Sequence, residues 1–352
     1  MSTNIIIAGR QIGPGQPPYI IAEMSGNHNG DINRAFTLIE AAKNAGADAV
    51  KLQTYTADTL TIDHDSPDFQ ITGGLWDGKS LYELYEQAHT PWDWHERLFA
   101  KGAELGITVF SSPFDHTSVD FLETLNAPAY KIASFEAIDL DLVKKVAATG
   151  KPLIISTGMS NECEISETVH TARNAGGQNL ILLHCISSYP AQPADMNLLT
   201  VPDMAARFDV PTGLSDHTLG TSVSVAGVAL GACVIEKHFT LARADGGPDA
   251  AFSLEPDELR ELVDSCRDIH GALGTATYER SESERSNMVF RRSLYVVEAM
   301  RAGDEFSRTN LRSIRPGYGL APKHLTAILG QKAACDIPRG TPMSIGLVAE
   351  EQ

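Results

Sequence analysis

The sequence of 352 residues lacks several features that would assign it to a specialised class. No segment concentrates Lys and Arg, and the net charge is −17, so the basic footprint that nucleic-acid binding requires is missing. No apolar run approaches the ~20 residues that span a membrane, and the N-terminus lacks the basic and apolar regions of a signal peptide. These absences predict a cytoplasmic protein that binds neither nucleic acid nor a membrane.

Cysteine is scarce and scattered. The five cysteines form no CxxC pair, and their number is odd. This pattern suggests neither a disulfide framework nor a cysteine-ligated zinc site. The remaining composition, with 43% hydrophobic and 21% charged residues, is that of a globular chain that can bury a sizeable core.

Short β-branched runs alternate with longer helical patterns along most of the chain. Most of the runs are apolar throughout, which is typical of parallel strands buried on both faces. Several helical patterns end at a glycine that suits helix termination. The predicted strands are 19–23, 48–52, 107–111, 129–133, 152–156, 180–184, 211–215 and 232–236, and the predicted helices are 32–46, 91–106, 139–150, 160–176 and 255–273.

Eight strand–helix units predict a (β/α)8 TIM barrel over residues 1–274. A doubly wound open sheet is the alternative, but its first turn is often a GxGxxG sequence, and here that turn reads EMSGNHNG. An insert at 55–90 follows the second strand. Because such an insert lies on the face where barrels keep their active sites, it is predicted to be a lid or a substrate wall, with an ornamental loop as the alternative.

Two further segments follow the predicted barrel. Residues 275–289 are polar and are predicted to be a linker. Residues 290–352 contain short strand patterns, glycine turns and one brief helix. A segment of about 60 residues is small for an independent domain, so it is expected to dock on something larger.

Polar residues collect at the C-terminal ends of all eight predicted strands, where a barrel enzyme places its active site. Lysines and serines among them indicate an anion site, with phosphate as the leading ligand. The alternative is that the lysines balance Glu23 or Glu136. The strand-end residues are Glu23, Ser25, Asn27, His28, Lys51, Gln53, Ser111, Ser112, Lys131, Ser134, Glu136, Ser156, Thr157, His184, Ser187, Tyr189, Ser215, Asp216, His217, Glu236, Lys237 and His238.

His217 and His238 follow the seventh and eighth strands, which are neighbours in a closed barrel. Two imidazoles that converge there, with room for water and substrate oxygens, suit a catalytic divalent metal such as Mn²⁺, Zn²⁺ or Fe²⁺. Asp216 is expected to orient this site from the second shell of contacts. Without the barrel, the two histidines would be unrelated.

Eight motifs occur in order along the chain: IIAEMSGNHNG, AVKLQTY, FSSPFD, YKIASFE, IISTGMS, LLHCISSYPA, GLSDHT and VIEKHFT. Together they resemble the sialic acid synthase family, whose enzymes join phosphoenolpyruvate to an acetamido sugar. LRSIRPGYGLAPKHLTAILG resembles the small antifreeze-like (SAF) domain of that family. The resemblance therefore implies a TIM barrel followed by a SAF domain at 290–352, and the activity of a C–C bond-forming transferase.

The insert narrows the substrate that the resemblance implies. DFQITGGLWDGKSLYELYEQAHTPWDWH resembles the insert of the pseudaminic acid synthases, which use 2,4-diacetamido-2,4,6-trideoxy-L-altrose. N-acetylneuraminate and legionaminate synthases are the near alternatives. The more distant ones are a sugar-binding barrel without activity, and a synthase for a phosphorylated sugar that would need a further Lys/Arg cluster.

The resemblance also implies roles for individual residues. The phosphoenolpyruvate anion is assigned to Lys51, Lys131, Ser134, Ser156 and Ser215. The divalent metal is assigned to His217 and His238, with Mn²⁺ foremost and Mg²⁺ or Co²⁺ as alternatives. The surroundings of the sugar are assigned to Glu23, Gln53, Tyr189 and Asp249.

Four further assignments complete this expected site. Ser187 stands where N-acetylneuraminate synthases usually have Asn, so a shorter side chain must make that substrate contact. Glu136 is expected near the reacting carbons, and Glu23 is the first choice for a base. Arg315 matches the SAF arginine that reaches the active site of a partner subunit, which implies a domain-swapped homodimer.

Overall fold

The computed structural model describes residues 4–350 and divides the chain into two compact units, Met1–Gly274 and Thr275–Gln352. The first unit contains a closed barrel of eight parallel strands in the order β10-β3-β4-β5-β6-β7-β8-β9, which confirms the predicted TIM barrel. Its strands are β3 (Tyr19–Glu23), β4 (Ala49–Thr54), β5 (Thr108–Pro113), β6 (Tyr130–Ile132), β7 (Leu153–Ser156), β8 (Leu180–Cys185), β9 (Thr212–Ser215) and β10 (Val234–His238).

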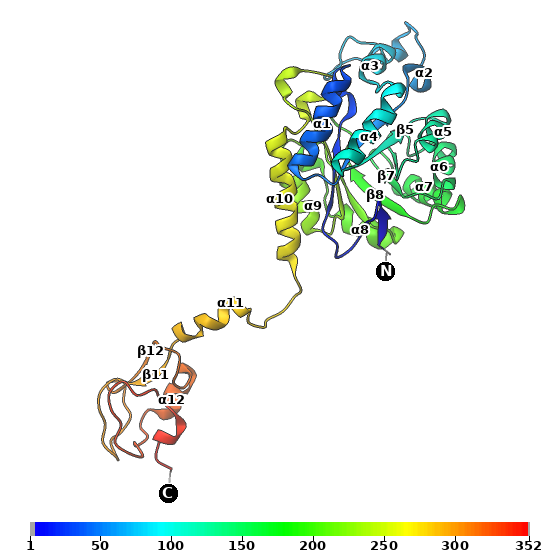
Figure 1. The fold of residues 1–352 in the computed structure, drawn as a ribbon. Coiled ribbons are helices and arrows are strands. Elements are labelled where there is room, and N and C mark those ends of the chain that lie inside the picture. The colour runs from blue at the N-terminus through cyan, green and yellow to red at the C-terminus, as the bar shows by residue number, and fades with distance from the viewer. Residues whose placement is uncertain (1–3, 351–352) are drawn as a thin grey trace. The chain divides into compact units, whose positions relative to one another are not determined.

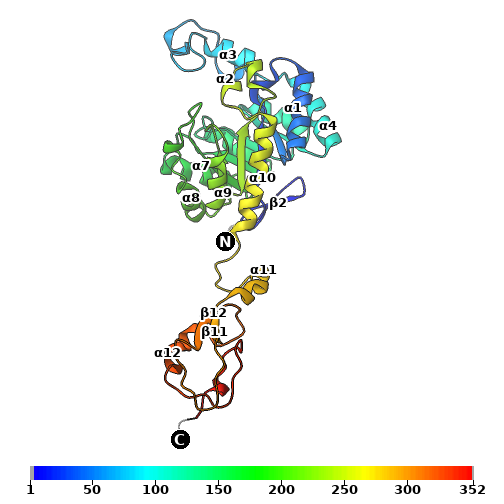
Figure 2. The ribbon, with the colours of Figure 1, turned by 90° about the vertical axis from the view of Figure 1, so that its left-hand side faces the viewer.

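Helices surround the barrel on its outside (Figures 1 and 2). Eight of them follow or connect the barrel strands: α1 (Ile32–Ala45), α4 (His95–Leu105), α5 (His116–Thr124), α6 (Leu140–Ala148), α7 (Glu162–Asn174), α8 (Thr200–Phe208), α9 (Ser222–Ala229) and α10 (Pro256–Leu273). The insert contributes α2 (Ala57–Leu60) and α3 (Leu81–Ala88).

Local signals explain where the predicted helices begin and end. The Asp31 side chain caps α1 by accepting a hydrogen bond from the amide of Asn33, and Gly46 ends this helix with a φ of 92°. Helix α9 was not predicted, because its sequence SVSVAGVA is rich in β-branched and small residues that disfavour helices. Helices α5 and α8 were not predicted either.

An N-terminal hairpin, β1 (Ile5–Ile7) and β2 (Arg10–Ile12), lies at the end of the barrel opposite to α2 and α3 (Figures 1 and 2). Its buried isoleucines join one apolar cluster with barrel residues that include Tyr19 and Phe110. Closing this end leaves the C-terminal ends of the strands as the open face. The hairpin was not predicted from the sequence.

Strand β9 was the weakest strand prediction because its sequence, TGLS, is not rich in large apolar residues. The structure gives the reason for its glycine. A Cβ atom on Gly213 would lie 2.1 Å from the carbonyl oxygen of Val234 on β10, so only glycine fits at this position.

The second unit has its own core, which includes Leu294, Val296, Phe306 and Leu311. Its regular elements are α11 (Glu282–Arg285), β11 (Ser293–Val296), β12 (Leu311–Ile314) and α12 (Leu325–Ile328). The stretch predicted to be a linker, 275–289, thus contains a short helix. No helix among residues 4–350 is long and apolar enough to cross a membrane.

Candidate active site

Alternation along the barrel strands sorts the strand-end residues into two sets, because successive side chains of a strand point to opposite faces. Below the open face, the barrel interior is apolar, with Ile21, Phe110 and Ile154 in one cluster. Two positions further along the strands, this lining becomes polar. The inward polar residues are Glu23, Lys51, Ser112, Lys131, Ser156, Ser215 and Glu236.

The intervening polar residues face the helices and do not join the site. His184 contacts the carbonyl oxygen of Met196 with its Nε2, at 2.6 Å. Asp216 forms an ion pair with Lys237 at 3.0 Å and accepts a hydrogen bond from the Ser224 hydroxyl at 2.6 Å. The expectation that Asp216 orients the metal site was therefore wrong, because strand alternation turns its carboxylate away from both histidines.

Two lysines and two carboxylates share the buried centre of the open face. Lys51 Nζ lies 2.6 Å from Glu23 Oε2 and 3.8 Å from Glu236 Oε1, and Lys131 Nζ lies 3.9 Å from Glu236 Oε1. Glu236 also accepts a hydrogen bond from the Ser215 hydroxyl at 3.2 Å. The lysines therefore do balance carboxylates, with Glu23 beside Lys51 and Glu236 within 4 Å of both lysines.

Burial and neighbouring charges shift the pKa values of this cluster in opposite directions. Burial raises the pKa of Glu23 to about 7, with Glu236 adding to the rise and Lys51 opposing it. Burial would also raise the pKa of Glu236, but Lys131 and Lys51 outweigh it and lower that pKa. For Lys131, burial prevails and lowers the pKa. Shifts of this kind are typical of functional sites.

His217 and His238 lie side by side beyond this cluster, with ring centroids 5.4 Å apart. Nδ1 of His217 is 3.0 Å from the carbonyl oxygen of Ile186, which leaves its Nε2 for a ligand. Nδ1 of His238 is buried and has no hydrogen-bond partner among the described residues. Burial, with the charge of His217 added, lowers the pKa of His238 well below its usual value, so this ring is neutral, as metal ligation requires.

The protein offers a metal ion only two ligands here, the rings of His217 and His238. No group of three or more His, Cys, Asp or Glu side chains in residues 4–350 is placed to hold a metal ion. A metal on His217 and His238 would therefore take its other ligands from water and substrate. This open coordination is the property that separates catalytic from structural sites.

Serines line the next part of the open face. The Ser134 hydroxyl accepts a hydrogen bond from the amide of Gly158 at 3.2 Å. A Cβ on Gly158 would lie 2.3 Å from Ser187 Oγ and 2.7 Å from Ser134 Oγ, so these two hydroxyls converge on one backbone segment. Ser156 Oγ is buried without a partner among the described residues. Ser187 thus lies with the serines assigned to the anion.

A cavity of about 420 Å³ opens above these residues. Gln53, Glu136, Tyr189, His238 and Asp249 all line it, whereas Glu23 does not. Gln53 connects the cavity to the charged cluster, since its Nε2 donates a hydrogen bond to Glu23 Oε1 at 3.0 Å. The Asp249 carboxylate accepts a hydrogen bond from the Ser25 hydroxyl.

The insert forms one side of this cavity. Leu60, Ile71, Trp76 and Leu81 of the insert line it, and Trp76 lies with its ring centroid 5.8 Å from that of Tyr189. The insert therefore lines the cavity, and its role as a lid or a substrate wall stays a prediction.

Comparison with known proteins places this arrangement in a family. Residues 38–278 match the NeuB family, and residues 291–345 match the SAF domain. The chain belongs to the NeuB family. This finding confirms the resemblance to sialic acid synthases and the expected order of barrel and SAF domain.

The NeuB relatives differ in how similar they are to this chain. Pseudaminic acid synthase from Campylobacter jejuni is 45% identical over 93% of this chain and 96% of its own length. N,N'-diacetyllegionaminic acid synthase from Legionella pneumophila is 37% identical over 92% and 93%. The crystal structure of N-acetylneuraminic acid synthetase from Leptospira borgpetersenii is 31% identical, with a TM-score of 0.74, and covers 82% of this chain and 96% of its own.

Glu236 belongs to this NeuB site but was not assigned a role from the sequence. It is buried between both lysines and Ser215. The signal was available, because Glu236 lies two residues before His238 and so faces the same side of β10. Arg315, in contrast, lies in the second unit, where it is exposed.

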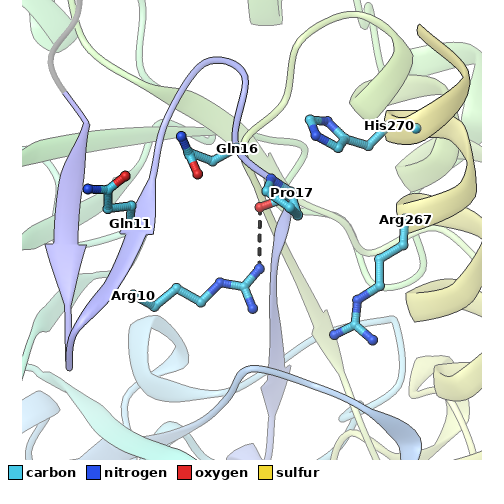
Figure 3. A pocket seen from close by; sticks show the side chains of 7 residues that line it. Arg10, Gln11, Gln16, Pro17, Arg267 and His270 are labelled. Carbon is cyan, nitrogen blue, oxygen red and sulfur yellow. Dashed lines mark hydrogen bonds between the residues drawn. The ribbon is translucent and has the colours of Figure 1, made fainter. Parts of the chain in front are cut away.

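A second hollow, of about 470 Å³, lies at the hairpin end of the NeuB barrel and does not have the character of a site. Figure 3 shows Arg10 with a hydrogen bond to the carbonyl oxygen of Pro17. Arg10 also pairs with the buried Asp48, and Arg267 donates to the carbonyl oxygen of Gly46. Its cations are therefore committed to structural contacts.

Glu136 makes stability depend on pH. Burial raises the pKa of Glu136 from 4.5 to about 7, so the folded chain binds more protons than the unfolded chain between these values. Stability contributed by this group is present below pH 4.5 and is lost as the pH rises towards 7. We therefore expect Glu136→Gln to raise the melting temperature relative to the wild type more at pH 8 than at pH 5. Parallel shifts at both pH values, or the same effect from the exposed Glu104→Gln, would contradict this.

Proposed function

We propose that this NeuB chain condenses phosphoenolpyruvate with 2,4-diacetamido-2,4,6-trideoxy-L-altrose to form pseudaminic acid and phosphate. The observation that carries the reaction type is the closeness of two buried lysines, Lys51 and Lys131, to His238, which lies beside His217 and lines a cavity of about 420 Å³. The higher identity to a pseudaminic acid synthase than to a legionaminic acid synthase supports the choice of sugar.

The anion and the metal would occupy neighbouring parts of the barrel mouth. Lys51 and Lys131 provide the positive charge for phosphoenolpyruvate, and Ser134, Ser156 and Ser215 provide hydroxyl donors. His217 and His238 would hold the divalent ion, for which we propose Mn²⁺. When bound, such an ion acts as a Lewis acid that polarises the aldehyde oxygen of the sugar.

The residues of this chain then act on the developing charges. The methylene carbon of phosphoenolpyruvate attacks the aldehyde carbon, and water adds to the neighbouring enol carbon. Glu23, with its pKa near 7, suits the removal of a proton from that water. The C–O bond to phosphate breaks, and the lysines stabilise the departing anion. Glu136 lines the cavity and lies near the reacting carbons in this arrangement.

An unphosphorylated sugar fits the cavity better than a phosphorylated one. Phosphate recognition normally uses Arg or Lys side chains. None of the residues described as lining the cavity is a Lys or an Arg. The polar groups at its floor, such as Gln53, Tyr189 and Asp249, suit hydroxyl and acetamido groups instead.

We further propose a domain-swapped homodimer in which Arg315 completes the site of a partner barrel. Residues 275–352 contain 11 Lys and Arg and nine Asp and Glu, a net charge of +2, so residues 1–274 carry −19. An acidic barrel that takes an anionic substrate gains from cations brought by a more basic domain. All five cysteines are free, which fits the reducing cytoplasm.

Arg315→Ala is expected to lower kcat/KM about 10- to 100-fold, the loss of a hydrogen bond to a charged group. The matched control is Arg312→Ala, which removes an exposed arginine of the same unit. Mixing Arg315→Ala with inactive His238→Ala subunits should restore activity to about a quarter of the sites, because each mixed dimer has one intact site. An absence of restoration would contradict the swapped arrangement.

Product analysis tests the reaction itself. Purified protein is supplied with Mn²⁺, phosphoenolpyruvate and the diacetamido sugar, and phosphate and the condensation product are measured. We expect equal amounts of both, and no phosphate when either substrate is omitted. Sugar binding without phosphate release would favour a binding protein, and sugar-independent phosphate release would favour a phosphatase.

A further inference from the structure

The cavity above the barrel has two chemically unlike sides. Outside the insert, its lining includes the polar residues Gln53, Glu136, His238 and Asp249, together with apolar side chains such as Phe114 and Phe135. The insert side is apolar, and its half-buried or buried side chains form what we call the insert wall: Leu60, Ile71, Trp76, Leu81, Leu84 and Tyr85. A ligand that fills the cavity therefore meets polar groups only away from the insert, and mainly apolar side chains along the insert.

The insert wall is held against the rest of the barrel. Trp76 Nε1 donates a hydrogen bond to the carbonyl oxygen of Pro248 at 2.8 Å. Close packing at Gly26 adds to this, because a Cβ there would lie 2.6 Å from Pro248 and 3.2 Å from Ala88 of the insert. These contacts join the insert to the loops after β3 and β10, so the wall is a built part of the cavity.

We infer that the insert wall binds the methyl-bearing end of the sugar, namely the C6 methyl group and the methyl of the 4-acetamido group. This inference rests on the proposed function. The reacting aldehyde at C1 must lie at the polar floor, beside His238 and the lysines. The opposite end of the sugar then reaches the apolar side, where methyl groups replace water without losing hydrogen bonds.

The insert wall thereby favours sugars that lack a hydroxyl group at C6. A hydroxyl at C6 would be buried against Ile71 and Leu81 without a hydrogen-bond partner from their side chains. A hydrophobic pocket rejects an added hydroxyl by about 100-fold. The wall does not read configuration, so sugars with the same methyl groups but other stereochemistry are left to the polar floor.

Two substitutions on the wall have matched controls within the same insert. Ile71→Thr and Leu81→Asn place polar atoms in the cavity, whereas Ile62→Thr and Leu75→Asn make the same changes at exposed positions outside its lining. The substrates are the diacetamido trideoxy sugar and its analogue with a hydroxyl at C6. We expect the wild type to prefer the deoxy sugar by about 100-fold in kcat/KM.

The wall variants should reduce this preference at least tenfold, mainly through KM for the deoxy sugar, with KM for phosphoenolpyruvate unchanged. The controls should keep the wild-type preference. An unchanged preference in both wall variants, or an equal loss for both sugars, would overturn the inference while leaving the proposed function intact. Failure of the wild type to use the deoxy sugar at all would instead reject the proposed function.

Discussion

Replacing His238 with Ala is expected to lower kcat by about 10³-fold or more, because the Lewis acid that the site needs contributes several kcal/mol to the transition state. His238 is half-buried, desolvation lowers the pKa of its ring, and its buried Nδ1 has no hydrogen-bond partner among the described residues. Its ring lies 5.4 Å from that of His217, centroid to centroid. The metal bound per subunit, measured after dialysis against Mn²⁺, should fall together with the activity.

The matched control for this experiment is His170→Ala, which removes an exposed histidine from α7. It should leave both kcat and the metal content unchanged. Full metal binding and turnover in the His238→Ala protein would contradict the proposed metal site. Loss of activity with normal metal content would assign His238 a role in substrate binding instead.

Lys51→Met is expected to cost activity and stability together. Lys51 is buried, and its Nζ lies 2.6 Å from Glu23 Oε2 and 3.8 Å from Glu236 Oε1. Removing this lysine therefore leaves buried negative charge uncompensated. Because breaking a buried ion pair by removing one partner is strongly destabilising, we expect Lys51→Met to lower the free energy of unfolding by about 3–5 kcal/mol. The variant also loses a cation for phosphoenolpyruvate, so kcat/KM for this substrate should fall about 10³-fold.

A double variant separates the two effects. Glu23→Gln combined with Lys51→Met removes both charges of the pair, so unfolding in denaturant should show most of the lost stability restored. Activity should stay low, because neither the cation nor the base has returned. If activity recovered together with stability, Lys51 would be a structural residue and the anion site would lie elsewhere.

The sequence was sufficient to predict the barrel because each barrel strand carries its own local signal. Strands such as LILLHC are apolar throughout, and helix ends are marked by residues such as Asp31 and Gly46. The seventh strand had the weakest signal, since close packing against Val234 requires a glycine where a β-branched residue would normally stand. The hairpin β1–β2 was missed because its burial depends on the barrel end that it closes.

Site residues could be predicted where the end of a strand alone determines the position of the side chain. His217 and His238 meet because β9 and β10 are neighbours, and Lys51 and Lys131 face the same interior. Asp216 was misassigned and Glu236 was overlooked for one reason: strand alternation had to be applied residue by residue. The insert wall could not be predicted in detail, because its position depends on tertiary contacts such as that between Trp76 and Pro248.

The measurement that tests the central proposal most directly compares two sugars with the unmodified protein. Phosphate release is followed with phosphoenolpyruvate, Mn²⁺ and either 2,4-diacetamido-2,4,6-trideoxy-L-altrose or N-acetylmannosamine at equal concentrations. We expect the diacetamido sugar to be turned over at least tenfold faster, because the proposed cavity receives its two methyl groups. Equal or faster turnover of N-acetylmannosamine would contradict it.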